Sequence, residues 1–259
     1  MSKIFLKNCH TFLFDLDGTV YCGNKPVPGA AALIEALKDR GCAVKYVSNN
    51  SSHAVDFVRE KLDRMGIQAE HEEIITPLST VGAFIHGHFG RSVVFVLGTK
   101  ALAQSIAKSG HRIAEGLESS DVVVIGRDIE ITYQKIELAC IHLQRGAACI
   151  VCNSDSSHPG ELGYLVPETG AFFNMVKTVC SPKLCLEIGK PDPFLYTYAF
   201  GGTDPKSCVM VGDNVDTDIM GAKRAGCRTV LLRGPLSFGR VEEADFCVES
   251  IPDILKLMA

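Results

Sequence analysis

The amino-acid sequence predicts an α/β protein with parallel sheets flanked by helices. Short apolar runs of strand length alternate along the chain with segments whose apolar residues recur at helical spacing. Such alternation is typical of strands joined by right-handed helical crossovers. The 259 residues, 46% of them hydrophobic and 22% charged, are enough for one large or two modest globular domains.

The first segment of the chain carries two strand–helix pairs. An apolar, aromatic run predicts a buried strand that enters a tight turn at Gly18, and a Gly- and Pro-rich loop follows over residues 20–30. Gly41 and Gly66 each stand just after a helical pattern, where glycine is favoured. The predicted strands cover residues 11–14 and 43–47, and the predicted helices cover residues 30–40 and 53–65.

The middle of the chain repeats this alternation from Pro77 onward, which is enough for a small sheet of its own. We therefore predict an inserted second domain over residues 77–179, between outer segments 1–76 and 180–259. Residues 153–171, rich in Gly, Pro and acidic residues, predict a long loop, and such loops are commonly functional. The predicted helices of this domain cover residues 78–89, 100–109 and 132–144, and its strands cover residues 93–97, 122–125 and 148–152.

The last segment resumes the first pattern. A strand or loop ends at Lys190, and a double proline then starts a helix. A very apolar strand runs into Gly212-Asp213-Asn214, and Gly226 ends the helix that begins at Thr217. The predicted strands here cover residues 208–211, 228–232 and 246–248, and the helices cover residues 194–200, 217–226 and 251–258.

Composition argues against several classes of function. A net charge of −4 gives no support for a nucleic-acid or anionic-membrane surface, and no apolar run reaches membrane-spanning length. Lys3 and Lys7 are not followed by the apolar stretch of a secretion signal, so eleven cysteines fit free thiols in a cytoplasmic protein. Cys149 and Cys152 have zinc-type spacing but lack a second pair, which favours core thiols over a metal site.

Asp15 and Asp17 are the first candidate site residues. Side chains alternate along a strand, so these two carboxylates, at the carboxyl end of the first strand, can point the same way. Paired carboxylates repel each other unless a cation is present, and Mg²⁺ is held by one or two carboxylates together with phosphate oxygens and water. The pattern predicts a Mg²⁺ site with Asp15 as nucleophile; the alternative is an ordinary polar turn that closes a strand.

Residues 48–52 form the second candidate. Ser48-Asn49-Asn50-Ser51-Ser52 follows the second strand and precedes a helix, where such side chains cap the helix or hold an anion. Capping needs one of these residues rather than five, which favours a phosphate contact. His86-Gly87-His88 resembles a metal pair, but its helical context favours a surface helix end.

The remaining strand ends of the outer segments add Lys190, Asp213 and Asp218. Singly, Lys190 is explained as a solvated loop lysine and Asp218 as an acid favoured at a helix start. Together with the first two candidates, however, they supply what phosphoryl transfer to a carboxylate requires. That chemistry needs a nucleophile, a metal, positive charge around the phosphate oxygens and an acid for the leaving group.

These motifs resemble those of the haloacid dehalogenase (HAD) superfamily of phosphatases, in particular the NagD-like and p-nitrophenylphosphatase-like enzymes of subfamily IIA. The resemblance covers nearly the whole chain, and a large insert separates the second and third motifs. It implies a HAD-like Rossmannoid core with an inserted α/β cap domain of the C2 type. In order, the motifs are Asp15-Leu16-Asp17-Gly18-Thr19, Val47-Ser48-Asn49-Asn50, Gly189-Lys190-Pro191-Asp192-Pro193 and Gly212-Asp213-Asn214-Val215-Asp216-Thr217-Asp218.

For catalysis, the resemblance implies that Asp15 attacks phosphorus and becomes an aspartyl phosphate. Asp17 would protonate the leaving group and then activate water. Ser48 and the Asn49 amide would bind the phosphate, and Lys190 would steady both the phosphate and the nucleophile.

For the metal, the resemblance implies Mg²⁺ held by Asp15, by the backbone carbonyl of Asp17 and by Asp213, with Asp218 bound through water or placed behind these ligands. The substrate-facing loop of the cap would be Cys152-Asn153-Ser154-Asp155, which in the subfamily usually reads Thr-Asn-Pro-Asp. Ser154 departs from that pattern, whereas Asn153 and Asp155 keep it and would bind substrate. A lid of this kind excludes water and sets specificity.

The resemblance implies a phosphatase of small phosphate monoesters, with sugar phosphates and nucleoside monophosphates as candidate substrates. The apolar helices of the cap could support a homodimer. Two alternatives come from other classes: a receiver-like phospho-acceptor domain and a catalytically idle phosphate-binding protein. A receiver needs neither an acid two residues after its aspartate nor a large lid, and this chain is expected to have both.

Overall fold

A computed structural model describes residues 6–160, 164–234 and 243–258. Lys3 of the N-terminal pattern, and Glu161 and Gly163 of the predicted long loop, lie outside the described residues. The chain divides into two compact units. The outer unit comprises Met1–Ser48, Val55–Ile75 and Lys190–Ala259, and the middle unit comprises Asn49–Ala54 and Thr76–Gly189.

The outer unit is built on a six-stranded parallel sheet with the strand order β15-β14-β13-β1-β4-β5. β1 (Thr11–Phe14) lies between β13 (Cys208–Gly212) and β4 (Ala43–Val47), so Phe14 stands opposite Val211 on one side and Tyr46 on the other. Because the strands are parallel, their carboxyl ends meet at one edge. The remaining strands are β14 (Arg228–Leu232), β15 (Phe246–Val248) and β5 (Ile74–Ile75).

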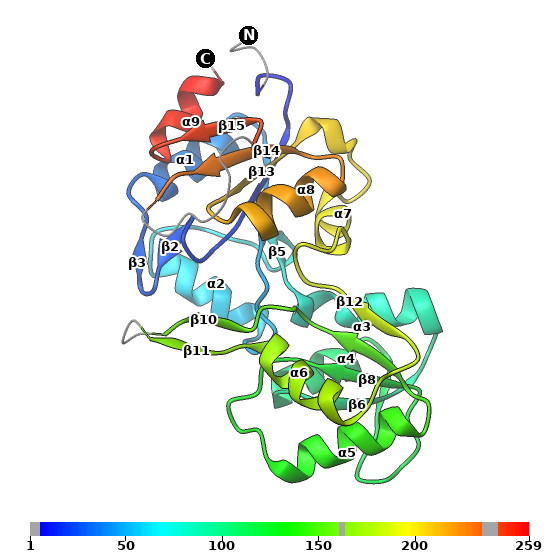
Figure 1. Cartoon of the computed structure of the whole chain (residues 1–259). Helices are drawn as coiled ribbons and strands as arrows, with labels where there is room; N and C mark the ends of the chain where they lie inside the picture. Colours follow the sequence, from blue (N-terminus) through cyan, green and yellow to red (C-terminus); the bar gives the residue numbers. More distant parts are fainter. Residues whose placement is uncertain (1–5, 161–163, 235–242, 259) are drawn as a thin grey trace. The chain divides into compact units, whose positions relative to one another are not determined.

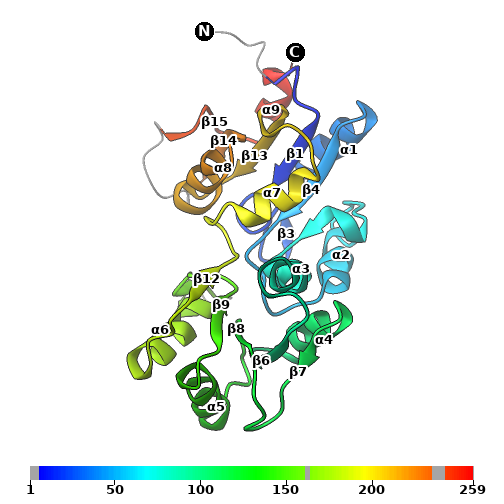
Figure 2. The same cartoon turned by 90° about the vertical axis from the view of Figure 1, so that its right-hand side faces the viewer.

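Helices cover both faces of this sheet (Figures 1 and 2). Phe12 and Phe14 pack into one core with α1, α2 and α9, whereas Leu13 packs into a second core with α7 and α8. Successive side chains of β1 point to opposite faces and both faces are buried, which explains why three consecutive residues of the strand are large and apolar. The helices are α1 (Ala30–Asp39), α2 (Val55–Asp63), α7 (Phe194–Phe200), α8 (Met220–Arg224) and α9 (Pro252–Leu257), with short 3₁₀ turns at His71–Glu73 and Pro205–Ser207.

Two local features of the outer unit differ from the predicted elements. The predicted loop over residues 20–30 contains a hairpin of β2 (Tyr21–Cys22) and β3 (Lys25–Pro26). The predicted helix over residues 217–226 begins earlier, as a π-helical turn over Val215–Ile219 that leads into α8. Asn214 explains this start, because its side-chain oxygen accepts hydrogen bonds from the backbone N–H groups of Asp216 and Thr217.

The middle unit has its own five-stranded parallel sheet, with the order β12-β9-β8-β6-β7. α5 and α6 pack on one of its faces through a shared core, and α3 packs against α4. The strands are β6 (Val93–Leu97), β7 (Arg112–Ile113), β8 (Val122–Ile125), β9 (Ala148–Val151) and β12 (Cys185–Glu187). The helices are α3 (Pro77–Phe89), α4 (Lys100–Lys108), α5 (Tyr133–Gln144) and α6 (Thr169–Val179).

The end of the middle unit differs from the predicted boundary at residue 179. β12 pairs with β9, with Leu186 opposite Ile150, and this pairing joins residues 180–189 to the middle sheet rather than to the outer one. The short segment 49–54 also belongs to the middle unit. Neither assignment is visible in the strand–helix alternation, because both depend on contacts between segments far apart in the chain.

The predicted long loop over residues 153–171 is wrong in part. Its described residues include an antiparallel hairpin of β10 (Ser157–Pro159) and β11 (Leu165–Pro167), and α6 begins at Thr169. Strands of three residues with Gly and Pro nearby show too little alternation for recognition.

All eleven cysteines lie outside disulfides, and Cys149 and Cys152 are fully buried, as expected of core thiols. Among the described residues, none of the helices combines the length and apolar character that a membrane crossing requires. The predicted α/β class, with parallel sheets and flanking helices, is confirmed.

Candidate active site

Asp15 lies at the carboxyl end of β1, in the centre of the outer sheet. Its backbone N–H donates a hydrogen bond to the carbonyl of Val211 at 2.9 Å, and only 8% of the Asp15 surface is exposed. The chain then turns through Gly18, whose φ of 92° lies in the left-handed region. A Cβ atom at this position would collide with the Asp213 carboxylate. Gly18 therefore lets the turn after β1 approach the end of β13 closely.

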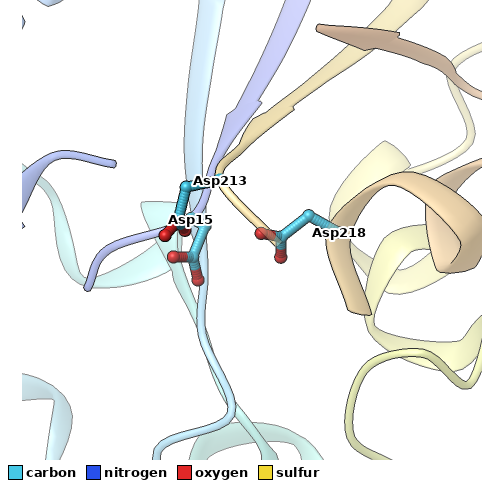
Figure 3. A group of neighbouring side chains, drawn as sticks. All are labelled: Asp15, Asp213 and Asp218. Atoms are coloured by element: carbon cyan, nitrogen blue, oxygen red, sulfur yellow. The ribbon is translucent and has the colours of Figure 1, made fainter. Parts of the chain in front are cut away.

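Three carboxylates converge at this edge of the sheet. Oxygen atoms of Asp15, Asp213 and Asp218 all lie within 4.8 Å of one another. Figure 3 shows the three side chains turned toward a common space. Asp213 follows β13 directly, and Asp218 lies in the π-helical turn. Among the described residues, this is the one group of three or more histidine, cysteine or acidic side chains close enough to hold a metal ion.

Lys190 joins the same group and is buried, with 3% of its surface exposed. Its Nζ atom donates to Asp15 Oδ1 at 2.5 Å and to Asp218 Oδ1 at 2.6 Å. The other oxygen of Asp218 accepts a hydrogen bond from the backbone N–H of Asn214 at 3.1 Å. Both oxygens of Asp218 are therefore engaged, and this carboxylate orients the lysine beside Asp15.

The electrostatics of the group leave an excess of negative charge. Burial would lower the pKa of Lys190, but the charges of Asp15 and Asp218 raise it well above its usual value, so the ammonium stays protonated. Burial, followed by the charge of Asp218, raises the pKa of Asp213 to about 6. Burial likewise raises the pKa of Asp15. The charge of Lys190 lowers this pKa, whereas the charges of Asp218 and Asp213 raise it further, and the net result lies well above the usual value. One ammonium faces three carboxylates, and this donor set fits a hard divalent cation such as Mg²⁺.

Asp17 is placed differently from the other acids. Asp17 is exposed, and its carboxylate is not one of the three that converge at the edge of the sheet. A β-bridge joins its backbone to Tyr21. Burial, the Asp17 charge and a hydrogen bond to Asp17 raise the pKa of the Tyr21 phenol. The Asp17 carboxylate thus lies beside Tyr21, apart from the three carboxylates that converge.

Ser48 and Asn49 follow β4 but belong to different units. The backbone N–H of Ser48 donates to the carbonyl of Ile75 at 3.1 Å in the outer unit. In the middle unit, the Asn49 amide donates to Asp155 Oδ2 at 2.9 Å, and the Asn153 amide donates to the Asn49 carbonyl at the same distance. Three residues of the predicted phosphate and cap sites are therefore held together in one network.

The rest of the polar stretch has structural partners. The side chain of Asn50 accepts hydrogen bonds from the backbone N–H groups of Ser52 and His53, which is the capping-type interaction weighed as the alternative. His88 Nδ1 lies 2.9 Å from the carbonyl of Phe84, one turn earlier on α3. Neither His86 nor His88 belongs to the metal-type group found among the described residues.

Two residues near the carboxylates were not assigned a role from the sequence. Thr19, fully buried, directs its hydroxyl at Asp213 Oδ1 at 3.4 Å. The buried hydroxyl of Tyr196 donates to the carbonyl of Thr217, in the turn that carries Asp218. Thr19 lies inside the first motif and could have been noted there, whereas nothing in the sequence connects Tyr196 with residue 217.

Comparisons with known proteins identify the family of the chain. A model described as haloacid dehalogenase-like hydrolase matches residues 12–112, and a second HAD-hydrolase-like model matches residues 187–251. An acid sugar phosphatase of Staphylococcus aureus (strain MRSA252) is 36% identical over 229 residues, which cover 87% of this chain and 86% of that protein. The 5′-nucleotidase YutF of Bacillus subtilis is 35% identical, with 88% of each chain covered.

A solved phosphatase structure is also similar to this chain. The 4-nitrophenylphosphatase of Thermotoga maritima superposes with a TM-score of 0.89 at 27% identity, covering 98% of this chain and 99% of that one. Each of these similarities extends over most of both chains. The chain belongs to the haloacid dehalogenase-like hydrolases.

Proposed function

We propose that this protein is a Mg²⁺-dependent phosphatase of small phosphate monoesters that works through an aspartyl-phosphate intermediate. The observation that supports this most directly is Lys190, which reaches both Asp15 and Asp218 within a group of three carboxylates. A strand-end carboxylate held by a buried ammonium is oriented for attack on an incoming phosphorus atom.

In the proposed first step, an oxygen of Asp15 attacks phosphorus while the bond to the ester oxygen breaks. The departing oxygen takes a proton from Asp17, which lies two residues away on the exposed side of the turn. In the second step Asp17 takes a proton from water, whose oxygen attacks phosphorus. The bond to Asp15 then breaks and inorganic phosphate is released.

The other residues hold charge and geometry. Asp15, Asp213 and the backbone carbonyl of Asp17 would hold Mg²⁺, with Asp218 behind them. When bound, the metal would neutralise the phosphate oxygens and offset the repulsion among the carboxylates. Lys190 would orient Asp15 and bind a phosphate oxygen, and Asp218 would fix the position of Lys190.

We further propose that the middle unit is a C2-type cap domain. Residues 77–179 and the strand β12 that follows them would form this cap. Ser48 and Asn49 would contact the phosphate, and Asn153 and Asp155 would contact the rest of the substrate. The relatives named for sugar phosphates and 5′-nucleotides support small phosphorylated metabolites as the substrate class. The cytosolic location and the homodimer stay predictions.

The test is phosphate release from p-nitrophenyl phosphate with and without Mg²⁺, for the native protein, Asp17→Asn and Asp15→Asn. A phosphatase should turn over only with Mg²⁺, and Asp17→Asn should bind substrate and metal yet lose turnover. Steady-state hydrolysis unchanged in Asp17→Asn would refute the mechanism. A receiver-like domain would instead accept one phosphate without turnover, and an idle binding protein would release none.

A further inference from the structure

A second charged cluster lies in the middle unit, away from the three aspartates. Arg127 follows β8, and its Nε atom lies 3.7 Å from Glu168 Oε2. His158 Nδ1, on β10, lies 3.0 Å from the same oxygen. Neither nitrogen has a hydrogen-bond partner among the described residues, although both atoms are buried. Two basic side chains therefore share one carboxylate oxygen.

Glu168 is engaged on its other side. Its Oε1 atom accepts hydrogen bonds from the backbone N–H and the hydroxyl of Thr169, both at 3.0 Å, and so fixes the start of α6. The carboxylate thus orients Arg127 without saturating it, because a guanidinium carries five N–H donors in a rigid fork. The Arg127 side chain is three-quarters covered, with 25% of its surface exposed, which leaves part of the fork accessible to a ligand.

Hydrogen bonds connect this cluster with the residues proposed to meet substrate. The backbone N–H of Arg127 donates to the Ser51 hydroxyl at 2.9 Å. That hydroxyl lies 3.2 Å from the hydroxyl of Thr169, which in turn accepts a hydrogen bond from the Asn153 amide at 3.2 Å. Asn153 also bonds Asn49, as described above. Arg127 is therefore attached through three hydrogen bonds to the segment that carries the proposed phosphate and cap contacts.

We propose that Arg127 determines specificity by binding an anionic group on the leaving group of the substrate, a carboxylate or a second phosphate. This inference rests on the function proposed above and names its substrate class more narrowly. A planar guanidinium with unused donors binds either anion through paired N–H···O bonds, and a neutral sugar or glycerol offers no such partner. Residues 153–171 contain no basic cluster, and Arg127 supplies the positive charge from outside that stretch.

Two matched pairs of substrates test the proposal in the presence of Mg²⁺. The first pair is 3-phosphoglycerate with glycerol 3-phosphate, and the second is fructose 1,6-bisphosphate with fructose 6-phosphate. The native protein should prefer the member with the extra anion in at least one pair. Arg127→Gln should lower kcat/KM for that member by about 10- to 100-fold, mainly through KM, and by less than about twofold for its neutral counterpart.

Controls separate a specificity role from a structural one. Arg127→Lys should retain part of the preference, because it keeps the charge but not the fork. Arg91→Gln, at an exposed arginine of the same unit, should behave as the native protein. The pair that responds identifies a carboxylate or a phosphate as the anion. Equal losses on both members of each pair, no change on either, or a native protein without preference would overturn the proposal. No hydrolysis of p-nitrophenyl phosphate by the native protein would instead refute the phosphatase assignment.

Discussion

The two units use the same parallel architecture but place different residues at their strand ends. In the outer unit, β1 and β13 lead into Asp15 and into Asp213, just beyond the last residue of β13. In the middle unit, β6 and β8 lead into Gly98 and Gly126, and a Cβ atom on either would press on Leu102 of α4. The ends of β1 and β13 thus gather charge around a lysine, while the glycines that follow β6 and β8 pack against a leucine. The fold provides the edge, and the residues at the strand ends decide its chemistry.

The largest effect is expected at the nucleophile. Asp15→Asn should lower kcat for p-nitrophenyl phosphate on the order of 10³-fold or more, because an amide cannot form the aspartyl phosphate. It should also raise the melting temperature measured without Mg²⁺, since it removes one of three carboxylates that lie within 4.8 Å of one another and repel each other. Activity measured beside thermal unfolding checks both parts. A lower melting temperature would mean that the Lys190 ion pair outweighs the repulsion.

The close approach of the two strand ends is tested at Gly18. Gly18→Ala should lower kcat/KM by about tenfold or more, because the added Cβ displaces the Asp213 carboxylate. Gly23→Ala is the matched control: its φ of 57° imposes similar backbone strain, but nothing lies within 4 Å of the added atom. Both variants should lose about 1 kcal/mol of stability from the left-handed backbone. Equal activity in the two would show that the turn does not position the carboxylates.

Gly98, which follows β6 in the middle unit, should respond in stability rather than in chemistry. Gly98→Ala forces the added methyl group against Leu102, which costs about 1–3 kcal/mol when a packed core is overfilled. Denaturant unfolding measures this loss, and kcat/KM for p-nitrophenyl phosphate should stay within about twofold of the native value. A fall in kcat/KM as large as that of Gly18→Ala would contradict the contrast between these strand ends.

The smallest effect concerns pH and the metal. The pKa of Asp213 in the folded, metal-free protein is raised from 3.8 to about 6. A raised folded pKa means that this acid contributes stability below about pH 4 and that the contribution is lost as the pH rises through 6. Mg²⁺ should compensate once the carboxylate is ionised. The increase in melting temperature on adding Mg²⁺ should therefore be larger at pH 7.5 than at pH 5.0, and an equal increase would argue against a metal at Asp213.

Much of the fold could be predicted from the sequence. Helices such as α1 and α5 are marked by the spacing of their apolar residues, and the buried strand β13 is marked by an uninterrupted apolar run. The hairpin of β10 and β11 and the turn at Val215–Ile219 could not, because short elements depend on capping and pairing rather than on periodicity. The pairing of β12 with β9 also could not be predicted, because the partner strand lies more than thirty residues earlier in the chain.

The candidate site, like the fold, could be predicted from the sequence only in part. The acids and the lysine could be selected because each follows a strand or loop end in the sequence, where parallel strands bring residues together. The pairing of Lys190 with Asp218, and of Arg127 with Glu168, depends on side-chain directions that spacing does not encode. The sequence also gives no reason to expect that Ser48 and Asn49 belong to different units.

Lys190 is the first residue of the outer unit after the chain leaves the middle one. Gly189, the residue before it, has no room for a Cβ atom beside the carbonyl of Cys152. A chimaera that replaces the insert must therefore keep a glycine immediately before Lys190, because any side chain there would collide with the carbonyl of residue 152. Exchange of the insert is thus constrained at the residue next to the ammonium that contacts Asp15.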